Sequence, residues 1–337
     1  MNSPKRITIV DLARDLGLAK TTVSDALQGK GRVAPETVAL VRTRAEELGY
    51  VLNRAARSLR SRSTGALGLY IPPVVRNFSF YMEFAFGAAE AAARAGADLV
   101  LIARDHSAMV EQPSAVGGLL VIDPLAGDPT IQHFVATGLD MVSVGRLPEA
   151  SLPHHLGVIE ADHSGLSRSV FDAVFARGAR RPAFLGSDGT FFSSWAEDVA
   201  ASYRAWCAEH GIEPLADTVS VEADTMALSG KVSTLLAAGA DAIITGPQGF
   251  AARVLPLVRA AGKDPAAFPL ASLVGDPSTE LNDPRIISVD LLPRAFGEAS
   301  IRLLVDRLGA TGRPVHRTHG GRVVHAGPSD TPGRGGD

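Results

Sequence analysis

A group of polar side chains near the N-terminus has the spacing that contacts with bases and phosphates require. Lys20, Thr21 and Asp25 fall one turn apart on one face of an expected helix, and Thr22 and Ser24 lie beside them. Such side chains exchange hydrogen bonds with base edges in a major groove or with phosphate oxygens. The pattern predicts a nucleic-acid contact; the alternative is an ordinary helical hairpin with a polar surface.

Three short helices are expected to position these residues. The first is expected over 9–16 and the second over 20–27, with a turn at Gly17 between them. The third begins at Pro35, a residue type that is favourable in the first turn of a helix. Apolar residues at helical spacing in all three predict a small shared core. We therefore expect a helix-turn-helix domain over residues 1–50.

The charge of the chain is unevenly distributed. Residues 1–63 carry twelve Lys and Arg against six Asp and Glu, whereas the whole chain of 337 residues has a formal net charge of −3. A basic N-terminal part joined to an acidic remainder fits a nucleic-acid contact that is confined to one end.

From about residue 66 the pattern changes to apolar runs that alternate with helices, which predicts a parallel α/β sheet. We expect strands at 66–71, 97–103, 118–122, 141–145, 182–186, 242–245 and 270–274. We expect helices near 80–95, 164–177, 195–210, 228–238, 249–261 and 293–308. The Gly- and Pro-rich residues 328–337 are expected to form a disordered tail.

Several functional classes are disfavoured by what the sequence lacks. It contains no phosphate-binding loop, dinucleotide fingerprint or serine-nucleophile motif, so we expect neither an enzyme nor a cofactor. Cys207 is the only cysteine, which excludes a disulfide framework and a multi-cysteine metal site. With no secretory signal and no apolar run of membrane-spanning length, we expect a cytoplasmic protein. A group of histidines without metal-ligand spacing is interpreted as solvated loop residues, with no metal: His154, His155, His163, His316, His319 and His325.

Residues 7–60 resemble the lactose/galactose-repressor (LacI/GalR) family of bacterial transcription regulators. The matching residues are Thr8, Asp11, Leu12, Ala13, Gly17, Thr22, Val23, Ser24, Val33, Thr37, Leu48, Gly49, Tyr50, Asn53, Ala56, Ser58 and Leu59. A weaker resemblance extends through residues 66–325. The resemblance implies a DNA-binding, nucleoid-associated homodimer that binds a pseudo-palindromic double-stranded operator.

The same resemblance implies roles for individual residues of the head. Lys20, Thr21 and Asp25 match positions that contact bases, whereas Thr8 and Thr22 match positions that contact phosphates. Residues 53–60 match a hinge helix that lies in the minor groove, where an inserted apolar side chain unstacks a base step. The hinge residues implied to contact DNA are Asn53, Arg54, Ala56, Arg57, Leu59 and Arg60.

For the remainder, the resemblance implies a two-lobed α/β core of the periplasmic-binding-protein-like type I class. The expected fold is thus an all-α helix-turn-helix head (1–50), a hinge helix and linker (51–64), and a ligand-binding and dimerisation core (65–327). Lobe 1 is expected at about 65–161 and 291–320, and lobe 2 at about 162–290 and 321–327. Ligands of such sheets lie beyond the carboxyl ends of the strands. The expected effector-binding residues are therefore Phe78, Phe80, Tyr81, Asp123, Arg146, Asp188, Phe191, Trp195, Gln248 and Asp276.

The sequence departs from the family pattern at several positions. Ala19 and Ala34 occupy positions where the family usually has a serine cap, and a lost cap costs about 1 kcal/mol. Asp25 places an acid where many relatives have a base. Gly246-Pro247-Gln248 replaces a more polar pair, so the effector class stays open between a sugar and another metabolite.

Two functions are therefore open. The first is a ligand-responsive transcription regulator, acting as a repressor and as a homodimer, because the C-terminal part lacks leucine heptads for tetramers. The second is a cytosolic small-molecule-binding protein or a sugar-processing α/β enzyme with an unrelated basic head. Only the first predicts salt-sensitive binding to a pseudo-palindromic duplex.

Overall fold

The computed structural model describes residues 9–28, 33–48, 65–103, 116–147, 155–188, 193–310 and 312–325. The chain divides into two units, Met1–Arg62 and Ser63–Asp337. The hinge helix expected within 51–64 and the tail expected at 328–337 lie outside the described residues.

The N-terminal unit contains three helices: α1 (Ile9–Asp15), α2 (Lys20–Gln28) and α3 (Pro35–Glu47). These helices agree with the three predicted from the sequence. Gly17 turns the chain between α1 and α2 with a φ of +63°, which a glycine adopts without a Cβ clash. The helices pack on a common apolar core of Leu12, Ala13, Val23, Ala26, Val41 and Ala45.

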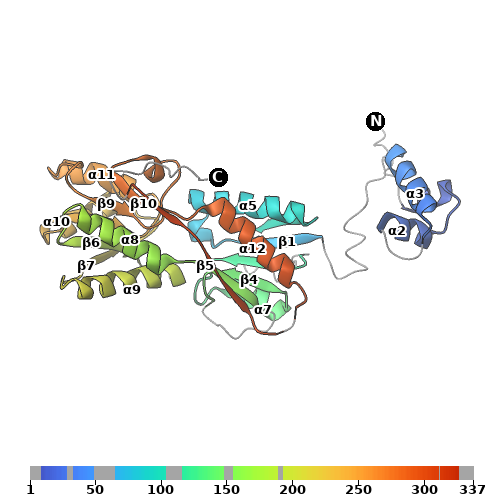
Figure 1. The fold of residues 1–337 in the computed structure, drawn as a ribbon, viewed down its shortest axis with the longest axis horizontal. Coiled ribbons are helices and arrows are strands. Elements are labelled where there is room, and N and C mark those ends of the chain that lie inside the picture. The colour runs from blue at the N-terminus through green and yellow to red at the C-terminus, as the bar shows by residue number, and fades with distance from the viewer. Residues whose placement is uncertain are drawn as a thin grey trace, which may run out of the picture. The chain divides into compact units, whose positions relative to one another are not determined.

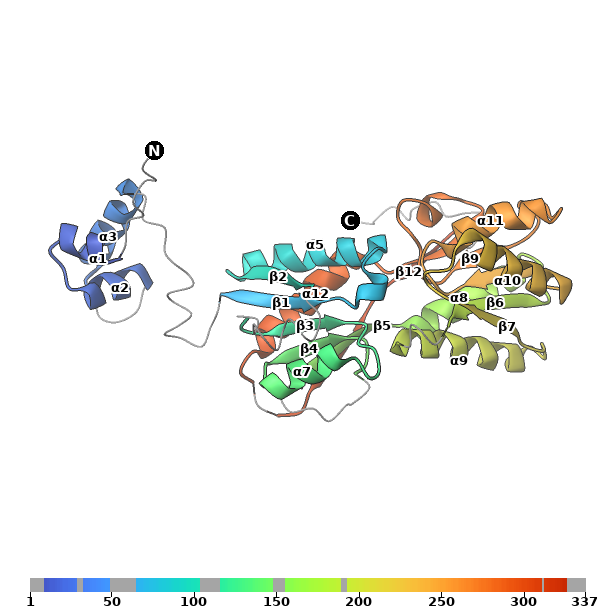
Figure 2. The same cartoon turned by 180° about the vertical axis from the view of Figure 1, so that it is seen from behind.

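The second unit contains two six-stranded sheets, one in each lobe (Figure 1). The lobe 1 sheet has the order β11-β5-β4-β3-β1-β2, and its neighbouring strands are all parallel. Its strands are β1 (Ala66–Tyr70), β2 (Asp98–Ile102), β3 (Leu119–Ile122), β4 (Met141–Val144), β5 (His155–Ala161) and β11 (Val315–His319). Its helices are η1 (Pro73–Val75), α5 (Ser79–Arg94), α7 (Pro129–Thr137) and α12 (Pro293–Arg307). Helices α5 and α12 cover one face and α7 covers the other (Figure 2).

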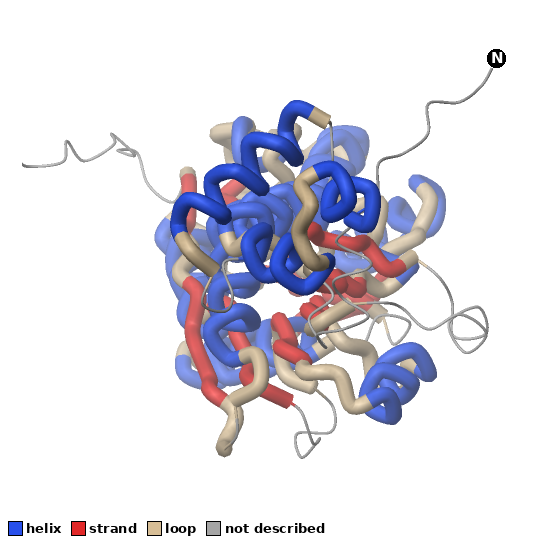
Figure 3. The backbone as a smooth tube through the Cα atoms, turned by 90° about the vertical axis from the view of Figure 1, so that its right-hand side faces the viewer, coloured by secondary structure: helices blue, strands red, loops and turns tan. Residues whose placement is uncertain are grey.

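The lobe 2 sheet has the order β12-β10-β9-β8-β6-β7, in which only the short β12 is antiparallel to its neighbour. Its strands are β6 (Pro182–Ser187), β7 (Leu215–Val219), β8 (Ala242–Thr245), β9 (Leu270–Ser272), β10 (Ile286–Asp290) and β12 (Arg322–Val324). Its helices are α8 (His163–Ala176), α9 (Ser194–Glu209), α10 (Thr225–Ala237), α11 (Phe250–Ala260) and η2 (Glu280–Asn282). Helices α8 and α9 pack on one side of the strands and α10 and α11 on the other, which explains why the inner strands β8, β9 and β10 are buried at every position. Figure 3 distinguishes the helices and strands of the chain by colour.

The chain passes between the lobes three times: after β5, after β10 and after β11. One apolar cluster of buried residues continues from lobe 1 into lobe 2, from Leu67 through Phe84 to Phe171 and Trp206. The lobes therefore share a packed boundary at the level of these crossings.

Helices α5 and α12 pack unusually closely at two glycines. A Cβ atom on Gly297 would lie 2.1 Å from the carbonyl oxygen of Phe84, and one on Gly87 would lie 2.0 Å from that of Arg294. Backbone therefore packs directly on backbone at this crossing. The rings of Phe84 and Phe296 meet beside it at 5.6 Å. This crossing fixes the part of α5 that carries the aromatic residues of the site described below.

The sequence-based prediction found seven of these strands and missed several elements. The missed elements are α7, β5, β7, β10, β11 and β12. Three of the missed strands have exposed or half-exposed positions along their length, as in the pattern of β7, and therefore lack a continuous apolar run.

Candidate functional sites

The head presents a polar face on α2. Lys20 and Thr21 are exposed, whereas Val23 and Ala26 on the same helix have no exposed surface. Thr22, Ser24 and Asp25 are half-buried. A helix with a donor-rich exposed face and an apolar inner face can place its polar side chains in a DNA groove while the core holds its orientation.

Ala19 and Ala34 directly precede α2 and α3, at the cap positions expected from the sequence. Their carbonyl groups accept the first helical bonds, from the amides of Val23 and Val38. Alanine has no side-chain oxygen to accept from the next free amides, so both helices begin without a side-chain cap. The other predicted DNA-contacting residues lie outside the described residues: Thr8, Asn53, Arg54, Ala56, Arg57, Leu59 and Arg60.

A cleft lies between the two lobes of the core. Its aromatic walls are Phe78, Phe80, Tyr81, Trp195 and Phe296. The first three precede or begin α5, and Trp195 begins α9 in the other lobe. The rings of Phe80 and Tyr81 pack edge to face at 5.2 Å. The cleft is therefore mainly apolar, with a few polar groups that could fix the orientation of a ligand.

Asp123 is a polar group at the lobe 1 side of this cleft. It follows β3, has a φ of +45° and is 9% exposed. Its carboxylate accepts a hydrogen bond of 2.7 Å from the Tyr81 hydroxyl. Burial raises the pKa of Asp123 to about 7, although the bond from Tyr81 opposes this shift.

Two predicted residues of lobe 2 contact lobe 1 directly. Gln248, which lines the cleft, accepts a 3.2 Å hydrogen bond from the amide of Phe80. Asp276 accepts a 2.8 Å bond from the hydroxyl of Ser79 and is not among the residues that line the cleft. Burial opposes ionisation of Asp276, but hydrogen bonds from Ser278 and Ser79 outweigh it and lower its pKa.

Glu280 holds the two loops that carry Gln248 and Asp276. It has no exposed surface. Its carboxylate accepts bonds from the amides of Gly249 at 3.1 Å, Ala252 at 3.2 Å and Asp276 at 3.0 Å, and from the hydroxyl of Ser272 at 2.8 Å. Two of these amides belong to the N-terminus of α11, where a negative charge is stabilised. Burial nevertheless raises the pKa of Glu280.

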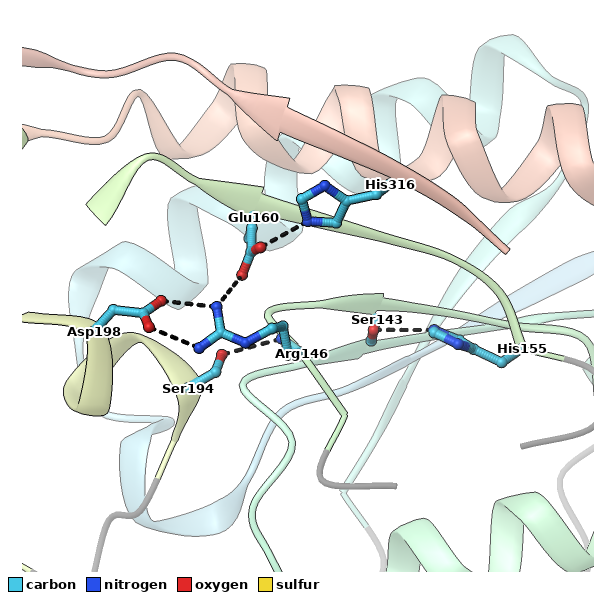
Figure 4. Close-up of polar contacts among 7 residues, drawn as sticks. All are labelled: Ser143, Arg146, His155, Glu160, Ser194, Asp198 and His316. Atoms are coloured by element: carbon cyan, nitrogen blue, oxygen red, sulfur yellow. Dashed lines mark hydrogen bonds and ion pairs between the residues drawn. The ribbon is translucent and has the colours of Figure 1, made fainter. Parts of the chain in front are cut away.

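Arg146 does not line the cleft; it joins the two lobes beside it (Figure 4). Its guanidinium donates two bonds to Asp198 of α9, at 2.8 and 2.7 Å, and its amide donates a 3.0 Å bond to Ser194. We call Arg146, Ser194 and Asp198 the interlobe clasp. The same guanidinium binds Glu160 at 3.0 Å, and Glu160 in turn contacts His316 at 2.6 Å.

Removing the clasp carboxylate should loosen the lobes. In Asp198→Asn we expect a broader distance distribution between one spin label on each lobe, measured by pulsed electron paramagnetic resonance. The loss of unfolding free energy should be about 1 kcal/mol or less, because the pair is partly exposed. The control is Glu209→Gln, which removes a carboxylate paired with Arg168 inside lobe 2. If both variants had the same distance distribution, the interlobe clasp would not restrain the lobes as proposed.

The remaining predicted effector residues are placed as follows. Asp188, half-buried after β6, donates its amide to the carbonyl of Val219 and does not line the cleft. Phe191 lies outside the described residues. The structure thus brings six predicted residues together around the cleft: Phe78, Phe80, Tyr81, Asp123, Trp195 and Gln248. Their role in effector binding stays a prediction.

Sequence reasoning missed cleft residues at the lobe boundary. Glu160 ends β5, His163 begins α8, and Phe296 lies on α12. The first two lie at a lobe crossing whose strand was not predicted. Burial lowers the pKa of His163 to about 4, so this ring is neutral near pH 7.

The interpretation of the histidines as solvated loop residues is wrong for His155. It begins β5, is buried, and bonds Ser143 through Nε2 at 3.2 Å. His163, His316 and His319 also lie in regular elements, whereas His154 is outside the described residues. Among the described residues, no group of three or more His, Cys, Asp or Glu is arranged to hold a metal ion.

Comparison with known proteins finds similar transcriptional regulators. Residues 171–325 match the model of the periplasmic binding protein-like domain. The HTH-type transcriptional regulator CelR of Thermobifida fusca is 27% identical over 94% of this chain and 96% of its own. The maltose regulon regulatory protein MalI of Vibrio furnissii is 42% identical over 21% of this chain, and the match spans 53% of the MalI length. The chain is thus similar to transcriptional regulators, in line with its resemblance to the LacI/GalR family.

Solved structures agree with the fold of a LacI/GalR-family protein. The lac repressor dimer bound to operator and an anti-inducer matches with a TM-score of 0.77 at 19% identity, over 95% of this chain and 98% of that chain. The sequence-based fold class, a helix-turn-helix head joined to a two-lobed α/β core, is confirmed. The relatives named above are transcriptional regulators. Within the described residues, no helix has the length and apolarity needed to span a membrane.

Proposed function

We propose that this protein is an effector-responsive transcriptional repressor that binds a pseudo-palindromic operator as a homodimer. The observation that carries the proposal is the exposed polar face of α2, with Lys20 and Thr21, in the same chain as an interlobe cleft. The basic balance of residues 1–63 supports the same assignment. Operator binding would place the protein in the cytoplasm, at the nucleoid.

An apolar surface on lobe 1 supports pairing with a second copy of the chain. Met82 and Phe86 on α5, and Leu101 on the neighbouring edge strand β2, are 52%, 48% and 50% exposed. Adjacent large apolar side chains of this kind are typical of protein interfaces. The lac repressor compared above is a dimer on its operator. Two heads held in a symmetric pair would require two half-sites in the DNA.

Control by an effector follows from the contacts between the lobes. Three sets of contacts join the two lobes: Ser79–Asp276, Phe80–Gln248 and the interlobe clasp (Figure 4). An effector shifts the balance between lobe arrangements only by its difference in affinity for them. We propose that this shift sets whether residues 51–64 can form the hinge helices that hold the heads on DNA.

The experiment that tests this function is selection of preferred duplexes from a random pool by the full chain. The expected result is enrichment of a sequence with two inverted half-sites. The recovered operator would also locate the regulated genes. Absence of any enriched sequence, or enrichment of one without inverted repeats, would contradict symmetric operator binding.

A further inference from the structure

Three of the polar residues that line the cleft, Gln248, Ser194 and Glu160, are already bonded within the protein. The Gln248 amide accepts one backbone hydrogen bond and donates another, at 3.2 and 3.3 Å. Ser194 accepts the amide of Arg146, and the Glu160 carboxylate is paired with the same arginine. These bonds occupy part of the bonding capacity of the three residues.

Asp123 has few partners among the described residues. Among the described residues, Tyr81 is the one side chain that donates a hydrogen bond to its carboxylate. The described residues that line the cleft include no lysine and no arginine. The nearby cation, Arg146, is bound to Asp198 and Glu160. Among the described residues, therefore, no cation pairs with the buried carboxylate of Asp123, an arrangement that is costly unless a partner is supplied.

The walls beside Asp123 are aromatic. Phe80 and Trp195 are less than a tenth exposed, and Phe296 is 3% exposed. Aromatic faces attract a cation, more strongly where water is excluded. Because these walls are apolar, they also suit the hydrocarbon part of a ligand.

We propose that the effector carries a protonated amino group that pairs with Asp123 and an apolar body that packs on the aromatic walls. This proposal rests on the proposed function, in which the cleft binds an effector. A ligand with a carboxylate or phosphate in this position would meet Asp123 and Glu160 without a free cation. A neutral hydroxyl could donate to Asp123 but would leave its charge unpaired.

The pairing predicts a pH dependence. Asp123 must lose its proton to pair with an ammonium group, and its pKa of about 7 places this step near neutral pH. Two other lining residues do not titrate there: the pKa of Tyr81 is raised well above 10 by burial, and burial lowers the pKa of His163 to about 4. Glu160 is held by Arg146 and His316. Amine affinity should therefore rise about tenfold from pH 6 to pH 8.

Three probes that share one ring and differ in one group test the proposal: cyclohexylmethylamine, cyclohexylmethanol and cyclohexanecarboxylate. Each has about eight or nine non-hydrogen atoms, for which a Kd in the millimolar range is expected. Binding to the full chain is followed by tryptophan fluorescence, since Trp195 lines the cleft. At pH 8 the amine should bind about tenfold more tightly than the alcohol, and the carboxylate most weakly.

Asp123→Asn keeps the size of the side chain and removes its charge. It should abolish both the preference for the amine and the rise with pH. The control is Glu222→Gln, which removes an exposed carboxylate next to the lining residue Val221. This substitution should change neither the preference for the amine nor the rise of affinity with pH. The melting temperature of each variant shows whether it is folded.

The proposal is overturned if the alcohol or the carboxylate binds as tightly as the amine, if Asp123→Asn keeps the preference, or if no probe binds. In each of these cases operator binding by the same protein would leave the proposed function standing. If the protein bound the amine but bound no operator, the proposed function as a transcriptional regulator would be overturned instead.

Discussion

Replacing Gly297 with alanine is expected to lower the free energy of unfolding of the core by about 3 kcal/mol. The added Cβ would lie 2.1 Å from the carbonyl oxygen of Phe84 and 2.9 Å from the amide nitrogen of Ala88. Both obstacles are backbone atoms of α5, so no side-chain rotation can relieve the clash. Helices α5 and α12 must move apart, which separates the buried rings of Phe84 and Phe296.

A second glycine provides the matched control. Gly230 is an exposed residue of helix α10, and a Cβ there would have no atom within 4 Å. Gly230→Ala should therefore increase stability by about 0.5–1 kcal/mol, through helix propensity alone. Urea unfolding followed by the fluorescence of the two tryptophans measures both changes. If Gly297→Ala is as stable as the unmodified chain, the close helix crossing is not as described.

Glu280→Ala is expected to cost about 3 kcal/mol or more of unfolding free energy. The substitution leaves the amides of Gly249, Ala252 and Asp276 and the hydroxyl of Ser272 without their acceptor. These donors lie in or beside the two loops that follow β8 and β9 and contribute Gln248 and Val274 to the cleft.

Glu280→Gln separates the hydrogen bonding of Glu280 from its volume. One oxygen of Glu280 accepts from three of the donors and the other from Ala252. An amide retains one oxygen, so Gln should cost less than Ala, about 1–2 kcal/mol. Glu213→Ala, at an exposed position of the same lobe, should change stability by about 0.5 kcal/mol or less. Equal unfolding midpoints for Glu280→Ala and Glu213→Ala would refute the role of Glu280.

The elements that sequence reasoning located are those with an unambiguous apolar pattern. β3 and β8 are buried at every position, so each is a short run of apolar residues between polar segments. β7 is an edge strand whose Asp217 is not buried, and β11 is half or fully exposed along its length. Their pairing with β6 and β5 depends on distant segments that a local pattern does not contain.

The candidate site was predictable where it follows from the position of strand ends. Asp123 lies beyond the carboxyl end of β3, and the aromatic residues beginning with Phe78 follow β1 after η1, as the rule for open α/β sheets requires. Arg146 follows β4 in the same way, yet its guanidinium is bound by Asp198, 52 residues away. Phe296 comes to the cleft from α12 of the opposite end of the sequence. Neither of these long-range contacts can be predicted from the local sequence pattern.

The central claim is that the head binds duplex DNA through the polar face of α2. The direct measurement is the affinity of the full chain for its selected duplex as a function of salt concentration. The account predicts that log K falls linearly with log salt. Lys20→Gln should weaken binding about tenfold or more. Arg42→Gln, which removes an equal charge from an exposed position of α3, should weaken it by less. Salt-independent binding, or equal losses in the two variants, would contradict the claim.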